Sequence, residues 1–126
     1  MKLENQSGIL ESIYKTIEER AQNPKQESFT NYLLKSGLDK TCKKVGEEAT
    51  EIIIAAKNDS KDDLVGEIAD LAYMTLVLMY QRGVTVEDVA NKLRERNKAK
   101  AADTFVPRKS KFNLGGDRET LTQTAP

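Results

Sequence analysis

Four acidic residues in two equally spaced pairs are the part of this sequence best suited to chemistry. Glu48 and Glu51 are three residues apart, as are Glu67 and Asp70, and the turn-forming segment Asn58-Asp59-Ser60 lies between the pairs. Residues three apart are neighbours on one helix face. If two helices fold back antiparallel about this turn, Glu51 comes level with Glu67, and Glu48 with Asp70. The spacing therefore predicts four carboxylates converging between two helices.

Carboxylates that converge in this way repel one another, so we expect a cation to bind among them. Hard oxygen ligands favour Mg²⁺, with Mn²⁺ as a possible substitute. In proteins Mg²⁺ is commonly shared between carboxylates and substrate phosphates. The acidic pattern therefore predicts a magnesium-dependent enzyme that acts on a phosphate ester. The alternative is that lysines of the helix that carries Glu48 and Glu51 form salt bridges with Glu67 and Asp70.

The absence of histidine narrows the possible chemistry. Without histidine, and with Cys42 as the one cysteine, the chain has no Ser-His or Cys-His nucleophile and lacks the favoured zinc ligands. A glutamate is then the expected general base, and Glu47 and Glu48 are the candidates. Four nearby lysines are expected to bind substrate phosphates: Lys35, Lys40, Lys43 and Lys44.

Length and composition indicate one modest domain. The chain has 126 residues, of which 38% are hydrophobic, with 20 basic and 20 acidic residues. Balanced charge argues against a general nucleic-acid or membrane binder. No apolar run reaches membrane-spanning length and no signal-peptide pattern opens the chain, so we expect a cytoplasmic location.

Apolar residues recur with helical spacing nearly throughout, which predicts an all-α fold, a compact helical bundle around a central antiparallel hairpin. Residues 1–100 are expected to form this domain, and residues 101–126 an extended or flexible tail. The expected helices lie around residues 9–17, 28–36, 39–57, 60–82 and from 85 onward.

The two helices of the hairpin differ in pattern. The third helix is expected to carry an apolar stripe centred on Cys42, Ala49 and Ala56, with Cys42 an inert core thiol and Glu48 at the border of the stripe. The fourth is apolar almost all round, which predicts a central position. In its stretch from residue 64 to 80 the only charges are Glu67 and Asp70.

These residues resemble a known pattern. Glu47-Glu48-x-x-Glu51 followed by Glu67-x-x-Asp70 is similar to the metal-binding signature of the MazG-like nucleotide pyrophosphohydrolases. Four further strings resemble the phosphoribosyl-ATP pyrophosphohydrolases of histidine biosynthesis, and the resemblance runs from about residue 9 to residue 97. They are Ser28-Phe29-Thr30, Gly37-Leu38-Asp39-Lys40, residues 43–49 (KKVGEEA) and residues 54–58 (IAAKN).

The resemblance implies that Glu48, Glu51, Glu67 and Asp70 are metal ligands, with Glu47 near the metal or the attacking water. It implies hydrolysis of phosphoribosyl-ATP to phosphoribosyl-AMP and pyrophosphate, the second step of the pathway, by a homodimer. Two alternatives stay open. One is a house-cleaning (d)NTP pyrophosphohydrolase of the same superfamily, and the other is a non-enzymatic helical dimerisation module.

Overall fold

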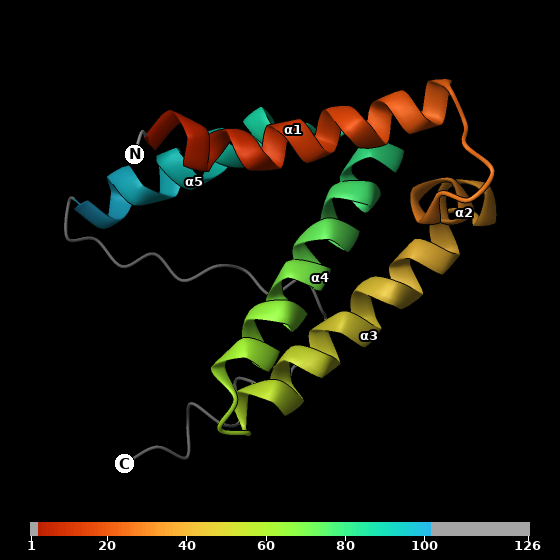
Figure 1. The fold of residues 1–126 in the computed structure, drawn as a ribbon. Helices are drawn as coiled ribbons and strands as arrows, with labels where there is room; N and C mark the ends of the chain where they lie inside the picture. The colour runs from red at the N-terminus through yellow and green to blue at the C-terminus, as the bar shows by residue number, and fades with distance from the viewer. Residues whose placement is uncertain (1–2, 102–126) are drawn as a thin grey trace, which may run out of the picture. The chain divides into compact units, whose positions relative to one another are not determined.

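The computed structural model describes the backbone of residues 3–101 and the side chains of residues 8–98. Within that range every regular element is a helix, which confirms the all-α prediction (Figure 1). Residues 102–126, nearly all of the predicted tail, lie outside the described range. The helices are α1 (Leu3–Gln22), α2 (Phe29–Ser36), α3 (Leu38–Ala56), α4 (Lys61–Gln81) and α5 (Val86–Ala101).

The chain divides into two compact units, residues 1–92 and residues 93–126. The first unit contains α1 to α4 and the start of α5. In the second unit, the described residues form the rest of α5. All of the residues discussed below as candidates for chemistry lie in the first unit.

Polar side chains fix where the helices begin. The Ser60 hydroxyl accepts a hydrogen bond from the backbone N–H of Asp63 at 3.2 Å, so α4 opens where the sequence predicted. The Thr85 hydroxyl accepts from the backbone N–H of Asp88 at 3.1 Å, and the Asp88 carboxylate accepts from that of Thr85 at 2.9 Å. Such caps satisfy N–H groups that have no partner within the helix.

The helix α4 is central in the first unit, as predicted, because it contacts α1, α2 and α3. It lies side by side with α3, and a short turn joins the two helices (Figure 1). The buried apolar core gathers around its C-terminal half, together with one residue each from α1 and α2. The core residues are Ile17, Leu33, Met74, Leu76 and Val77.

The predicted apolar stripe of α3 is correct at Ala49, which is partly buried, and wrong by one residue at each end. Thr41 and Ala55 are the buried residues of this helix, and Glu48 lies between them at helical spacing and is partly buried. Cys42 and Ala56 are exposed, so Cys42 is not a core thiol in this chain. The error has a physical cause: the packed side of α3 includes a threonine and a glutamate, which hydropathy assigns to the outside.

The part of the hairpin nearest its turn leaves large apolar side chains uncovered. Two are on α3, Ile53 at 64% and Ile54 at 52% exposed, and two are on α4, Val65 at 55% and Ile68 at 50%. Burial therefore decreases along α4 from its C-terminal end toward the turn. Among the described residues, no helix is long and apolar enough to cross a membrane.

We expect Gly37→Ala to destabilise the fold. Gly37 ends α2 and precedes α3 with φ +96° and ψ 176°, a conformation that is essentially restricted to glycine. The substitution should lower the free energy of unfolding by about 1–3 kcal/mol, measured by urea denaturation. The matched control is Gly66→Ala, at a helical position with nothing within 4 Å of the added methyl group, which should raise it by about 0.5–1 kcal/mol. Equal effects of the two changes would contradict the assignment.

Candidate metal centre

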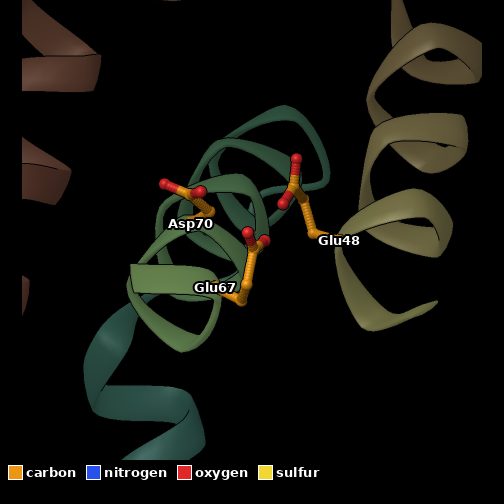
Figure 2. A group of neighbouring side chains, drawn as sticks. All are labelled: Glu48, Glu67 and Asp70. Atoms are coloured by element: carbon orange, nitrogen blue, oxygen red, sulfur yellow. The ribbon is translucent and has the colours of Figure 1, made fainter. Parts of the chain in front are cut away.

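Three of the four predicted acids meet between α3 and α4. Figure 2 shows Glu48 reaching from α3 toward Glu67 and Asp70 of α4. One carboxylate oxygen of each residue lies within 4.8 Å of the other two. We call Glu48, Glu67 and Asp70 the carboxylate cluster. Helical spacing explains it, because Glu67 and Asp70 lie about one turn apart and Glu48 lies opposite them.

The carboxylate cluster is open on one side. Glu48 and Glu67 are partly buried, whereas Asp70 is exposed. An anionic group sheltered by two helices loses part of its hydration, while an exposed neighbour keeps access to solvent. The cluster therefore lies where a small molecule can reach it from solvent.

Electrostatics in the cluster favour a bound positive charge. The pKa of Glu67 is raised above its ordinary value of 4.5, chiefly because the carboxyl loses hydration. The negative charges of Glu48, Glu51 and Asp70 raise it further, as does a hydrogen bond with the side chain of Glu48. Each of these causes disfavours the ionised form in the absence of a counter-ion.

No lysine of α3 forms an ion pair with the carboxylate cluster in the described part of the chain. The alternative in which lysines of α3 neutralise Glu67 and Asp70 is therefore not the arrangement in this structure. Oxygen-only donors match the preference of Mg²⁺. Donors on opposite sides of one Mg²⁺ ion lie about 4.2 Å apart, and the three carboxylate oxygens, within 4.8 Å of one another, are close to that spacing.

Two other predicted site residues lie beside the carboxylate cluster. Glu51 is exposed, one turn from Glu48, and is outside the group within 4.8 Å, although its charge acts on Glu67. Glu47 is also exposed, and its carboxylate lies 3.6 Å from the Lys44 ammonium. Their roles as metal ligand and general base stay predictions.

The four predicted phosphate-binding lysines lie in different environments. The Lys40 ammonium lies 5.8 Å from the centre of the Tyr32 ring, and Lys44 pairs with Glu47. Lys35 and Lys43 are exposed, and neither forms an ion pair with the carboxylate cluster in the described residues. Lys40 and Lys44 are four residues apart on α3, and Glu48 follows four residues later, so the three share one side of the helix.

Three aromatic residues near the cluster were not predicted as site residues, although Phe29 belongs to the Ser28-Phe29-Thr30 string that carries the resemblance. The Phe29 ring stacks on Tyr32 and on Tyr73, at centroid separations of 6.1 and 6.5 Å. Tyr73 follows Asp70 by three residues on α4, and therefore neighbours it on the helix surface. The signal available in the sequence was the spacing of Phe29 and Tyr32, which places two rings on one face of a short helix.

Comparison with known proteins gives a consistent result. Residues 10–97 match the sequence model of the family described as "Phosphoribosyl-ATP pyrophosphohydrolase". The chain is 49% identical over 90 residues to a "Phosphoribosyl-ATP pyrophosphatase" of Clostridium novyi (strain NT), covering 71% of this chain and 82% of that protein. A protein of the same name from Clostridium acetobutylicum is 51% identical over 89 residues, with 71% and 81% covered.

A longer relative matches as well. The "Histidine biosynthesis bifunctional protein HisIE" of Caldanaerobacter subterraneus subsp. tengcongensis is 50% identical over 90 residues, which cover 71% of this chain and 44% of that protein. The span that matches the family model contains the whole carboxylate cluster.

The raised pKa of Glu67 predicts a pH dependence of stability in metal-free protein. The folded chain holds this proton more firmly than the unfolded chain, whose pKa is near the ordinary 4.5. Between that value and the higher folded-state pKa, the folded state binds more protons, so the free energy of unfolding falls as pH rises. Below 4.5 both states are protonated and this contribution is fully present.

Urea unfolding in EDTA from pH 4 to pH 8 measures this effect. Glu67→Gln serves as the comparison, because it removes the titrating group and should leave a smaller decrease with rising pH. The comparison also cancels Asp88, whose pKa is lowered by hydrogen bonds from Thr85 and whose contribution has the opposite sign. Parallel pH profiles for the two proteins would contradict the electrostatic account of the cluster.

Proposed function

We infer, because this chain belongs to the phosphoribosyl-ATP pyrophosphohydrolase family, that it hydrolyses phosphoribosyl-ATP to phosphoribosyl-AMP and pyrophosphate, the second step of histidine biosynthesis. The observation that carries this inference is the match of residues 10–97 to the family model. Relatives named for the activity are 49% and 51% identical in sequence to this chain. A nucleotide substrate of a biosynthetic pathway also supports the cytoplasmic location expected from the sequence.

The proposed cofactor is Mg²⁺, with Mn²⁺ as a substitute, held by Glu48, Glu67 and Asp70. The convergence of their oxygens and the raised pKa of Glu67 support this assignment. Glu51 lies one turn from Glu48 on α3 and is exposed. We propose that it becomes a further metal ligand when substrate and ion are present. The ion would supply a Lewis acid that polarises a phosphoryl oxygen and neutralises charge on the leaving pyrophosphate.

The chain's own residues would then bind phosphate and accept a proton. Lys40 and Lys44, on the side of α3 that carries Glu48, can neutralise phosphate charge. In the reaction, the oxygen of water bonds to a phosphorus atom of the α–β anhydride, the P–O bond breaks, and pyrophosphate leaves. Glu47 is the proposed acceptor of the water proton, because it is exposed and lies outside the carboxylate cluster.

A direct assay tests the function. With Mg²⁺, the full chain should release pyrophosphate from phosphoribosyl-ATP faster than from any member of a panel of ordinary (d)NTPs. Glu48→Gln, Glu67→Gln and Asp70→Asn should each lower kcat at least about 100-fold, because each removes charge from the proposed metal site. Lys61→Gln, at an exposed position at the start of α4, is the control.

The alternatives predict other outcomes of this assay. A preference for (d)NTPs would indicate a house-cleaning pyrophosphohydrolase. A non-enzymatic dimerisation module would show no turnover, and Mg²⁺ would not raise its melting temperature. The metal-site proposal requires that Mg²⁺ raises the melting temperature of the unsubstituted chain more than that of the Glu67→Gln variant.

We also propose that the chain acts as a homodimer. The support is the set of exposed apolar side chains near the hairpin turn, Ile53 and Ile54 on α3 and Val65 and Ile68 on α4. Side chains of this size are usually buried, and a contiguous exposed apolar surface commonly marks a protein interface. A second copy could cover this surface by two-fold symmetry.

Sedimentation velocity over a concentration series measures the oligomeric state. The unsubstituted chain should sediment as a dimer, and Ile53→Lys should shift it toward the monomer, because a buried unpaired ammonium is costly. Ser12→Lys, at an exposed position on α1, is the control and should sediment as the unsubstituted chain does. A monomer at all concentrations for the unsubstituted chain would contradict the proposal.

A further inference from the structure

Phosphoribosyl-ATP has two anionic arms, and the carboxylate cluster accounts for one of them. The triphosphate is the arm that is hydrolysed. The other arm, a phosphoribosyl group joined to the adenine, distinguishes this substrate from ATP. An enzyme selective for it therefore needs a second group of phosphate-binding side chains, beyond the surface that holds the purine. The inference that follows rests on the proposed function and names that second group.

An aromatic surface lies beside the carboxylate cluster. It consists of Phe29, Tyr32 and Tyr73, and the Phe29 ring stacks on both others. Tyr73 is partly buried and is anchored by a hydrogen bond between its hydroxyl and that of Thr30. Phe29 and Tyr32 are each 49% exposed, so part of this aromatic surface is accessible to a planar ligand. Purines stack on such rings without requiring a particular hydrogen-bond pattern.

The lysines of α3 lie between this aromatic surface and the metal ligands. Lys40 lies over the Tyr32 ring at 5.8 Å. Lys44 is one turn further along α3 and one turn before Glu48. A nucleotide whose base stacks at Phe29 and Tyr32 could therefore extend its phosphates past the two lysines toward the cluster.

A hollow of about 610 Å³ adjoins the same aromatic surface at Phe29. It contains two cationic side chains, Arg20 at the end of α1 and Lys25 in the connection to α2, and one acid, Glu27. Arg20 is close enough to Tyr73 for its charge to act on the pKa of that phenol, although loss of hydration raises the pKa overall. The lining residues are Arg20, Lys25, Gln26, Glu27, Ser28 and Phe29.

Hydrogen bonds hold the backbone of this hollow in place. The side-chain amide N–H of Asn31 donates to the backbone carbonyl of Arg20 at 2.6 Å. The side-chain oxygen of Asn31 accepts from the backbone N–H of Lys25 at 2.7 Å. The backbone N–H of Ser28 donates to the carbonyl of Lys25 at 3.2 Å. The end of α1, the connection and α2 are thereby tied together, which positions Arg20 and Lys25 relative to Phe29.

We propose that Phe29 and Tyr32 stack on the purine of phosphoribosyl-ATP and that Arg20 and Lys25 bind the phosphate of its phosphoribosyl group. Arginine suits this role, because its planar guanidinium can donate two parallel hydrogen bonds to one phosphate. Lys25 adds a flexible second charge. These residues give the enzyme its preference for phosphoribosyl-ATP over ATP, while the carboxylate cluster acts on the anhydride common to both.

Product inhibition separates the two parts of the ligand. Phosphoribosyl-AMP and AMP are each titrated as inhibitors of phosphoribosyl-ATP hydrolysis by the full chain. Phosphoribosyl-AMP should bind the unsubstituted enzyme more tightly than AMP does. Arg20→Gln and Lys25→Gln should each raise the inhibition constant of phosphoribosyl-AMP about tenfold or more, because each removes a charged partner of the phosphate. That of AMP should change by less than about threefold.

Matched variants complete the experiment. Phe29→Leu keeps an apolar side chain without the ring, and should raise both inhibition constants by the same factor. Arg82→Gln and Lys61→Gln, at exposed positions elsewhere on α4 and its end, should leave both constants unchanged. Lys25 is exposed, so its variant keeps the test valid even if Arg20→Gln fails to fold.

The contrary results are distinct. If the ratio of the two inhibition constants is the same in Arg20→Gln, Lys25→Gln and the unsubstituted enzyme, the assignment of the hollow is overturned. It is also overturned if these variants change the sedimenting species and leave the ratio intact, since a second copy would then cover this surface. If the unsubstituted enzyme releases no pyrophosphate from phosphoribosyl-ATP, the proposed function itself fails.

Discussion

Repulsion among Glu48, Glu67 and Asp70 is the constraint on which the site depends. The acids are brought together by the α3–α4 hairpin, and loss of hydration together with mutual repulsion raises the pKa of Glu67. The stabilisation that offsets this repulsion comes from apolar burial elsewhere in the first unit. Met74, Leu76 and Val77 anchor the other half of α4 in the core with Ile17 and Leu33. The core residues and the acidic residues thus lie on different segments of α4. Such a separation is common where a functional site opposes folding.

The acidic site was largely predictable from sequence, because it depends on spacing alone. Helical rise and a marked turn predicted Glu48 level with Asp70 and Glu51 level with Glu67. The structure brings Glu48 to both acids of α4 and leaves Glu51 outside the group. The contact face of α3 was not predictable in the same way. Hydropathy places Cys42 inside and Glu48 at the border, whereas the packed side of α3 runs through Thr41, Glu48 and Ala55. A functional carboxylate on a helix contact face misleads any method that equates burial with apolar character.

The aromatic surface was missed for the opposite reason. Apolar residues on a short helix usually pack in the core, and Leu33 of α2 does so. Phe29 and Tyr32 on the same helix remain half exposed, and only the fold shows that Tyr73 of α4 stacks beside Phe29. Their connection with Arg20 likewise depends on the path from α1 to α2, which periodicity does not specify. Local pattern determines helices well, but long-range neighbours of different types are set by tertiary packing.

The link that Asn31 makes across residues 20–25 has an evolutionary consequence. The Asn31 side chain joins the end of α1 to the connection that follows it. The length of this connection therefore sets the position of the hollow relative to the α3–α4 hairpin. An insertion or deletion in this connection would shift the hollow and leave the acids of α3 and α4 in place. Ligand preference in such a scaffold can therefore diverge through a single short loop, with the hydrolytic machinery inherited intact.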